Sequence, residues 1–142
     1  MNNMATSSQT TFHELAFYTL AHPGTDFIHQ HAVDAFTAQE ATETTKPIAL
    51  YFALAGLYLF LEKNYTGRQV QQAHVLFTRK TKDYPRFTLP EARGVMRVGD
   101  VLAGPPGPER DGLIKAWCRV VWDTYQKEHN QVISFTEMLL DS

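Results

Sequence analysis

The sequence predicts an all-α fold, a single-domain helical bundle of about five helices with a long C-terminal helix. Apolar residues recur at the three- and four-residue spacing of amphipathic helices, and short segments rich in proline and glycine separate the helical stretches. Alternating apolar and polar runs, which are typical of strands, are not evident. With 142 residues, 44% of them hydrophobic, the chain can form one core without disulfides.

The first two helices follow a polar N-terminal segment. Residues 1–11 are rich in Ser, Thr and Asn, so we expect a flexible tail there and a single helical domain over residues 12–142. The spacing of apolar residues then predicts a helix over residues 12–21 and a second helix over residues 27–41. Asp26 is a suitable N-cap for the second helix.

The third helix is expected to be the buried centre of the bundle. Pro47 suits its first position, and residues 48–61 are fourteen consecutive uncharged residues that are nearly all apolar. Since a membrane span needs about 20 such residues, this run fits a helix buried on all sides, and no membrane partner is expected. Thr66 is a suitable N-cap for a fourth helix over residues 67–82.

The C-terminal half is expected to contain an irregular stretch and one long helix. Two prolines interrupt residues 83–90, and residues 100–103 fit a single helical turn. The Gly-Pro-Pro-Gly sequence at residues 104–107 breaks any helix. From Pro108 onward the pattern predicts a long final helix that reaches at least His129.

Composition and motifs exclude several classes of function. The net charge of −2 predicts no overall attraction to nucleic acid or to anionic membranes. Residues 1–11 lack the apolar region of a signal peptide, so a cytoplasmic location is expected. No phosphate-binding loop, zinc-finger spacing or serine-hydrolase motif occurs. We interpret Cys118, the single cysteine, as a buried and unreactive thiol.

Histidines on the second helix are the unusual feature. His29 shares a helix face with Val33 and Phe36, so it is expected to face the interior. His31 points about 200° away from His29 and is expected to be solvated. Asp34 follows His31 by three residues and could pair with it.

The final helix carries a carboxylate in an apolar stripe. Glu128 interrupts this stripe, and His129 lies at its edge. A buried carboxylate needs a partner or a metal ion. In one interpretation these groups make structural hydrogen bonds. In the other, His29, Asp34 and His129 hold a divalent transition metal (Zn, Fe, Mn or Ni), with Glu128 as the catalytic general base.

Four spaced segments carry a family resemblance. They are His29-x4-Asp34-Ala35-Phe36-x2-Gln39, Leu57-x-Leu59-x-Leu61-Glu62, Val98-x-Asp100-Val101-Leu102-Ala103 and Ala116-Trp117-x4-Trp122-x6-His129-x2-Val132. In combination they resemble the bacterial domain of unknown function 5946 family over roughly residues 12–135. His29, Asp34, Gln39 and His129 match the family pattern, whereas Glu40 and Glu128 stand where members often have histidine. The resemblance implies a helical fold, and because the family has no assigned activity it implies no reaction.

Residues 63–97 form a basic middle segment. They carry eight Lys and Arg against two carboxylates, a local charge of +6, whereas the rest of the chain carries −8. We favour a solvated face whose charges pair with the acidic remainder, because no nucleic-acid motif accompanies the charge. The alternative is an anion or nucleic-acid site formed by Arg68, Arg79, Lys80, Lys82 and Arg86.

The sequence therefore favours a helical interaction domain without enzymatic activity, a homodimer whose buried polar residues fix the packing. The main alternative is a metal-dependent hydrolase or thiol transferase centred on His29, Asp34 and His129. The sequence does not decide whether the protein is an enzyme.

Overall fold

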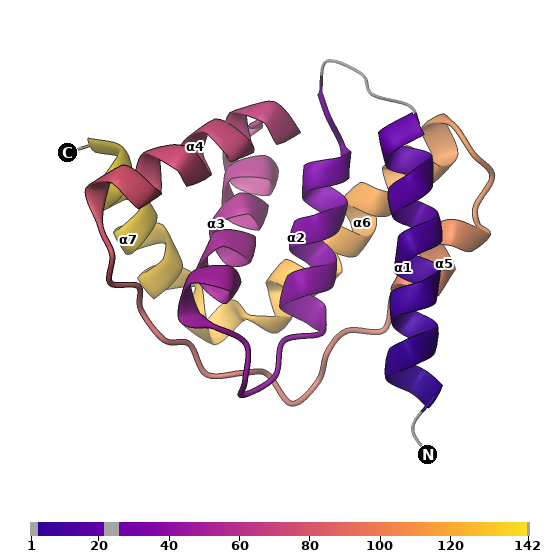
Figure 1. Cartoon of the computed structure of the whole chain (residues 1–142), viewed down its shortest axis with the longest axis horizontal. Helices are drawn as coiled ribbons and strands as arrows, with labels where there is room; N and C mark the ends of the chain where they lie inside the picture. The colour runs from indigo at the N-terminus through magenta and orange to yellow at the C-terminus, as the bar shows by residue number, and fades with distance from the viewer. Residues whose placement is uncertain (1–2, 22–25, 142) are drawn as a thin grey trace.

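The computed structural model describes residues 3–21 and 26–141, and in these residues the secondary structure is entirely helical (Figure 1). The predicted all-α class is confirmed, whereas the predicted number of about five helices is too low for the described residues. The described residues form seven α-helices and one short 3₁₀ turn: α1 (Asn3–Ala21), α2 (His29–Gln39), α3 (Pro47–Lys63), α4 (Gly67–Lys80), α5 (Val98–Ala103), α6 (Pro108–Thr124), η1 (Gln126–Glu128) and α7 (His129–Asp141).

Helices α2 and α3 lie at the centre of the arrangement. α2 contacts α1, α3, α4 and α6, and α3 contacts α2, α4, α6 and α7. In Figure 1 the first three helices stand side by side, α4 lies across the upper end of α3, and α6 crosses behind α2. The irregular segment 81–97 runs along the lower edge and joins α4 to α5. Most of the contacts between helices therefore involve α2 or α3.

Helix α3 forms the core, as its composition predicts. It begins with Pro47 at its first position, and Asn64, in a left-handed conformation with φ of 59°, ends it. Nine of its residues are buried, on every side of the helix: Leu50, Tyr51, Ala53, Leu54, Ala55, Gly56, Leu57, Tyr58 and Leu59. Within the described part of the chain, no helix combines the length and the hydropathy that crossing a bilayer requires.

The helix boundaries near the N-terminus differ from the expected ones. Helix α1 begins at Asn3 rather than at Phe12. Helix α2 is shorter than predicted, and its N-cap position is occupied by Ile28 instead of Asp26. Phe27, with φ of 48°, turns the chain before the helix, and the carbonyl of Asp26 accepts a 2.6 Å hydrogen bond from the Gly67 amide. Asp26 therefore connects to α4 instead of capping α2.

The N-cap of α4 is confirmed. The Thr66 hydroxyl accepts a 3.1 Å hydrogen bond from the Gln69 amide, and the Gln69 side chain accepts a 2.8 Å bond from the Thr66 amide. This reciprocal capping box satisfies two backbone donors that the first helical turn leaves unpaired.

The predicted long C-terminal helix is wrong, because the chain breaks at Tyr125 between α6 and α7. Side chains bond the carbonyls near the break: Thr124 Oγ1 donates to Val121 O at 2.6 Å, and His129 Nε2 lies 2.8 Å from Trp122 O. The Tyr125 hydroxyl donates to Ala38 O at 2.7 Å, which attaches the break to the end of α2. As a consequence, α7 turns to pack against α3 and α4.

Candidate functional site

The residues predicted as a metal and catalytic site have separate partners. His29 Nδ1 lies 2.8 Å from Thr19 Oγ1 of α1, and burial lowers the pKa of His29. Glu128 accepts a 3.2 Å hydrogen bond from the Thr88 amide. Over residues 3–21 and 26–141, no group of three or more His, Cys, Asp or Glu side chains is arranged to hold a metal ion. The metal-dependent alternative gains no support from this arrangement.

His129, at the start of α7, contacts Trp122 of the preceding helix α6 and not the other predicted metal ligands. Its ring stacks on Trp122, with ring centroids 3.8 Å apart and planes within 10°, and it hydrogen-bonds the Trp122 carbonyl. The break before α7 also removes Glu128 from the apolar stripe in which a continuous helix would place it, and this side chain is only half-buried in η1. The expectation of a carboxylate buried in that stripe is therefore wrong.

The buried face of α2 is not the predicted one. His31, expected to be solvated, is only 2% exposed, whereas His29 is half-buried. Phe36, expected to mark the core face, instead stacks on Phe12 of α1 with ring centroids 4.3 Å apart. Small side chains define the true core face and allow α3 and α6 to pack closely. These residues are Ala32, Ala35 and Ala38.

Asp34 is the most unusual group on this buried face. It is 3% exposed, and its Oδ1 accepts a 2.9 Å hydrogen bond from Gln30 Nε2. Its Oδ2 has no hydrogen-bond partner and lies directly against Gly56 of α3, where a Cβ atom would overlap it. Burial raises the pKa of Asp34 well above its usual value, although the Gln30 hydrogen bond opposes this shift. Burial therefore favours the neutral carboxylic acid of this side chain over its ionised form.

His31 lies one helical turn before Asp34. Its ring stacks on Phe60 of α3 with a centroid separation of 3.5 Å, and its Nδ1 is buried without a hydrogen-bond partner. Burial lowers the pKa of His31 to about 4, so the imidazole is neutral at pH 7. A neutral imidazole offers one donor and one acceptor nitrogen.

Cys118 of α6 completes the group from the other side. It is fully buried, and its Sγ lies 3.5 Å from the His31 carbonyl as a weak donor. Burial, and then the negative charge of an ionised Asp34, raise the pKa of the thiol, so it stays protonated. The predicted burial of Cys118 is confirmed. We call His31, Asp34 and Cys118 the buried polar seam; it lies where α2 meets α3 and α6.

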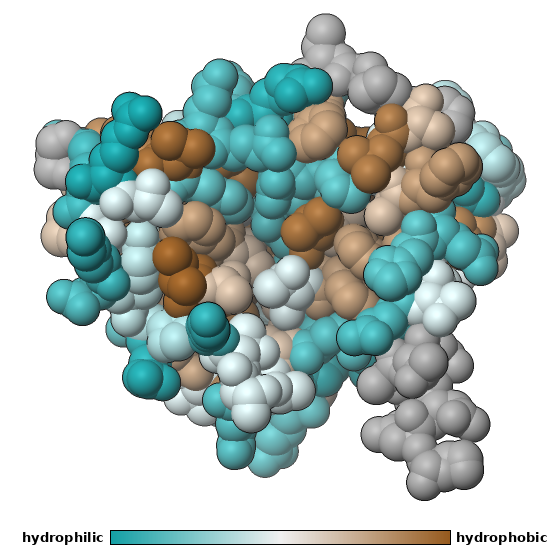
Figure 2. Space-filling model, in the orientation of Figure 1, coloured by the Kyte–Doolittle hydropathy of each residue, from teal (hydrophilic) through white to brown (hydrophobic). Residues whose placement is uncertain are grey.

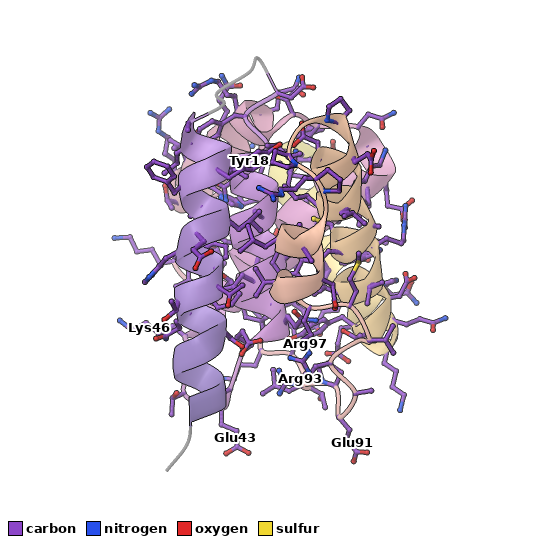
Figure 3. All side chains as sticks on the ribbon, turned by 90° about the vertical axis from the view of Figure 1, so that its right-hand side faces the viewer. Tyr18, Glu43, Lys46, Glu91, Arg93 and Arg97 are labelled. Carbon is purple, nitrogen blue, oxygen red and sulfur yellow. The ribbon has the colours of Figure 1, made fainter. Side chains whose placement is uncertain are left out.

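Gln39 at the end of α2 makes a second buried polar cluster. Its Nε2 donates to the carbonyls of Arg93 and Met96 at 2.8 Å each, and its Oε1 accepts a 2.9 Å bond from Trp117 Nε1. The Arg93 guanidinium donates back to the carbonyls of Gln39 and Ala41. Figure 3 shows Arg93 and Arg97 close together at this end of the molecule. These bonds attach the irregular segment to α2 and α6.

The sequence did contain a signal for His31. Residues His31, Ala35 and Ala38 follow the i, i+4, i+7 spacing of one helix face, and the two alanines are small enough for close packing. The prediction chose the wrong face because it ranked residues by hydropathy, which favours Val33 and Phe36 over the smaller alanines. Cys118 could not be joined to this group from sequence, because its contact with α2 spans 87 residues.

Part of the basic middle segment is paired as the sequence favoured. Lys63 forms a 3.5 Å ion pair with Glu137, and Arg97 a 3.4 Å pair with Glu40. Lys80 donates to the Leu139 carbonyl at 2.7 Å, and the Arg68 guanidinium lies 4.6 Å from the centre of the Phe27 ring. These contacts connect basic side chains to other elements of the fold.

The raised pKa of Asp34 makes the stability pH-dependent. Above about pH 3.8 this carboxyl ionises in the unfolded chain but not in the folded one, so the free energy of unfolding falls as pH rises toward the folded-state pKa. Asp34→Asn removes this loss while keeping the shape of the neutral acid. We expect the variant to gain up to about 1.4 kcal/mol over the wild type for each pH unit in that window.

Urea denaturation of both proteins between pH 4 and pH 7 measures this gain. Since the lowered pKa of His31 acts in the opposite direction in both proteins, only the difference between them reports on Asp34. A difference in the free energy of unfolding that stays constant with pH would contradict a raised pKa of Asp34.

A comparison with protein families assigns the chain to a family. The model of a family of unknown function, DUF5946, matches residues 5–126. The matched range contains α2 through α6, and thus the whole buried polar seam. Neither the curated proteins nor the solved structures provide a match. The chain belongs to the DUF5946 family of unknown function.

Proposed function

We propose that this protein is a helical interaction domain that pairs with a second copy of itself through α1. The exposure of two large apolar side chains on one stripe of α1 carries the proposal: Phe17 is 77% exposed and Leu20 is 52% exposed. Burying such side chains in an interface is favourable by about 1.5–3 kcal/mol each. Hydrophobic atoms lie over the C-terminal part of α1 on the face seen in Figure 2.

The outer face of α1 has the spacing of a helix-pairing seam. Its residues follow one another at intervals of three, four and three, as in the seam of paired helices. They are Thr10, His13, Phe17 and Leu20. The opposite side of α1 is already occupied, since Leu15, Tyr18 and Thr19 are buried in the fold. The outer face therefore remains available to a partner.

A groove of about 780 Å³ runs beside this seam, between α1 and the residues around α5. Its polar floor is fixed: the Tyr18 hydroxyl donates to Asp111 at 2.9 Å, and the Arg110 guanidinium lies 4.6 Å from the centre of the Tyr18 ring. Figure 3 shows Tyr18 near the C-terminal end of α1. The groove offers room for an aromatic side chain from a second copy, with Phe17 and Leu102 among its lining residues.

A second copy fits this face better than an unrelated partner because the seam is complementary to itself. In an antiparallel pair related by a two-fold axis near Phe17, the two Phe17 rings meet, and Leu20 of each copy lies opposite the alkyl part of Glu14 in the other. The seam has no run of like charges, since His13 is its one titratable member and Glu14 lies beside it. No large electrostatic repulsion opposes the pairing.

Leu20→Ser is expected to weaken self-association by about 100-fold or more. The substitution removes one buried leucine from each copy, and two such losses amount to about 3 kcal/mol of dimer stability. Sedimentation equilibrium over a concentration series measures the dissociation constants of the two proteins.

Val75→Ser is the matched control, because Val75 on α4 is also 52% exposed and lies outside the α1 seam. The control variant should associate like the wild type. If the wild type is a monomer up to high micromolar concentration, or if both variants lose association equally, the proposal is wrong.

A further inference from the structure

Helix α7 lies at the edge of the fold, on the opposite side of the molecule from α1. In Figure 1 it stands beside α3 and beneath α4. Its contacts with the other α-helices are mainly with these two. The connection from α6 is short, because only Tyr125 and the 3₁₀ turn η1 separate the two helices. A change of backbone conformation over residues 125–128 is therefore enough to move α7 away from α3 and α4.

The surface of α3 and α4 that α7 covers is shaped for this helix. The Tyr51 hydroxyl lies 2.7 Å from Thr136 Oγ1, and the Tyr58 hydroxyl donates to Glu137 at 2.6 Å. Three α7 side chains are buried: Val132, Thr136 and Leu139. We call this surface, which includes Tyr51, Tyr58, Lys63 and Lys80, the α7-binding surface. Because the α7 of a second copy is identical, it can make the same contacts.

The sequence of the connection is compatible with one continuous helix. No proline or glycine lies between Trp117 and Phe135. Trp117 and Val121 are buried residues of α6, and Tyr125, which follows at the next four-residue interval, is buried as well. A helix that continued past Thr124 would therefore keep Tyr125 on the face that α6 already buries. The residues at the break do not impose it.

Backbone hydrogen bonds at the break span three residues instead of the four of an α-helix. The Trp122 carbonyl accepts from the Tyr125 amide at 3.0 Å, and the Tyr125 carbonyl accepts from the Glu128 amide at 2.8 Å. In a continuous helix the same two carbonyls accept from the amides of Gln126 and His129. Straightening the chain therefore exchanges these hydrogen bonds for helical ones instead of removing them.

Side-chain contacts of His129 stabilise the break. Its Nε2 lies 2.8 Å from Trp122 O, and its ring stacks on the Trp122 ring with centroids 3.8 Å apart. In a continuous helix, residues seven positions apart are separated by roughly 10 Å along the axis, so this stack would be lost. His129 therefore favours the closed chain, in which α7 covers the α7-binding surface of its own chain.

We propose that two copies of this chain form a dimer by exchanging α7. In the exchanged dimer, residues 108–141 form one helix, and α7 of each copy covers the α7-binding surface of the other. Both surfaces stay covered and the α7 contacts are kept, so the exchange costs mainly the His129 contacts. A second copy is the partner because it carries an identical α7. The α1 seam takes no part in the exchange, so either proposal can fail without the other.

Lys63 and Glu137 report which chain supplies α7, because their charged groups lie 3.5 Å apart between α3 and α7. Equal amounts of ¹⁴N- and ¹⁵N-labelled full-length chains are mixed in urea and refolded together over a series of protein concentrations. A carbodiimide then joins lysine amines to carboxylates, and mass spectrometry identifies the linked peptides that contain these two residues.

In exchanged dimers about half of these links should join a ¹⁴N chain to a ¹⁵N chain. We call them mixed links, and their fraction should rise with the protein concentration during refolding. Pairing through α1 alone leaves Lys63 and Glu137 linked within one chain, so it gives no mixed links. The measurement therefore distinguishes the exchange of α7 from pairing through the α1 seam.

Substitutions at the break test how the exchange occurs. Lys127→Pro should lower the fraction of mixed links about tenfold or more, because proline fits the first turn of a helix such as η1 but not the interior of a continuous helix. Lys127→Ala is the matched control and should keep the mixed links of the wild type. Where exchange is incomplete, His129→Ala should raise their fraction about twofold or more by removing contacts of the closed chain. Asn130→Ala, at an exposed position of α7, should not.

Circular dichroism of each variant refolded at low concentration separates a loss of exchange from a loss of folding. Lys127→Gly is a second blocking variant, because glycine disfavours a helix without fixing φ. The proposal is overturned if neither the wild type nor His129→Ala gives mixed links at any concentration of the series. It is also overturned if mixed links are as frequent in Lys127→Pro and Lys127→Gly as in Lys127→Ala.

Discussion

Replacing Gln39 with alanine is expected to lower the free energy of unfolding by about 3–5 kcal/mol. The amide side chain pairs two carbonyls of the irregular segment and the indole N–H of Trp117, which is fully buried. Each buried polar group left without a partner costs about 1–3 kcal/mol. The substitution also removes the two hydrogen bonds that hold the segment around Arg93 against the end of α2. The expected loss of stability is therefore larger than the loss caused by a cavity of the same size alone.

Urea denaturation followed by circular dichroism measures the change. Gln72→Ala is the matched control, since Gln72 is an exposed residue of α4, and its removal should change stability by less than about 0.5 kcal/mol. Arg93→Ala should show part of the Gln39 effect, because this guanidinium donates to the carbonyls of Gln39 and Ala41. A loss below about 1 kcal/mol for Gln39→Ala would show that this cluster does not anchor the segment.

Gly56→Ala is the second substitution with a large expected effect, a loss of about 2–3 kcal/mol. A Cβ at this position would overlap Asp34 Oδ2, and it would also approach Val70 Cγ1 to 3.2 Å. The helix α3 and the buried Asp34 can separate only by disturbing the centre of the core. The gain of about 1 kcal/mol that alanine normally brings to a helix interior reduces the loss but does not cancel it.

A double-mutant cycle identifies the cause of this loss. Asp34→Ala removes the overlapping carboxyl, so Gly56→Ala should cost at least about 1 kcal/mol less in that background. Gly112→Ala in α6 is the control, because nothing lies within 4 Å of its Cβ position, and it should stabilise the protein slightly. Equal losses with and without the Asp34 carboxyl would disprove the direct contact between Asp34 and Gly56.

The helices α3 and α4 could be predicted from the sequence, because residues within or next to each helix determine where it begins. Residues 48–61 are apolar on all sides, which requires burial on all sides, and α3 is the core helix. Pro47 and Thr66 act through their own backbone and hydroxyl groups, so the starts of α3 and α4 do not depend on distant contacts. The start of α1 was missed, because polar residues such as Ser and Thr also occur within helices.

The break before α7 could not be predicted, because tertiary contacts stabilise it. Periodicity continues through residues 117–135, and no proline or glycine lies between Trp117 and Phe135. The bond from the Tyr125 hydroxyl to Ala38 joins residues 87 positions apart. Only the folded chain reveals that Glu128 leaves the apolar stripe as a result.

The candidate site shows the same limit. The sequence marked Asp34 as a polar group between helices, and its burial agrees with that expectation. Its neighbours, however, come from packing: Gly56 meets its carboxyl because α2 and α3 cross there, and Cys118 approaches from α6. His29 and His129, the other proposed metal ligands, instead hydrogen-bond Thr19 and the Trp122 carbonyl. Helix periodicity predicts which face of its own helix a residue lies on, but it does not predict which other helix packs against that face.

The most direct test of self-association through α1 is an electron spin resonance distance between two copies. Ala21→Cys provides an exposed labelling position at the end of the seam, and native Cys118 is fully buried and should not react with the label. When the two-fold axis passes near Phe17, Ala21 of one copy lies opposite His13 of the other, so the two labelled positions are offset by eight residues along the helix axis. With the labels attached, this offset and the spacing of packed helices predict a distance of roughly 15–25 Å between the two labels. A narrow distribution in this range that grows with protein concentration and is lost on Leu20→Ser would support the pairing. The absence of a dipolar interaction, or a signal that Leu20→Ser leaves unchanged, would contradict it.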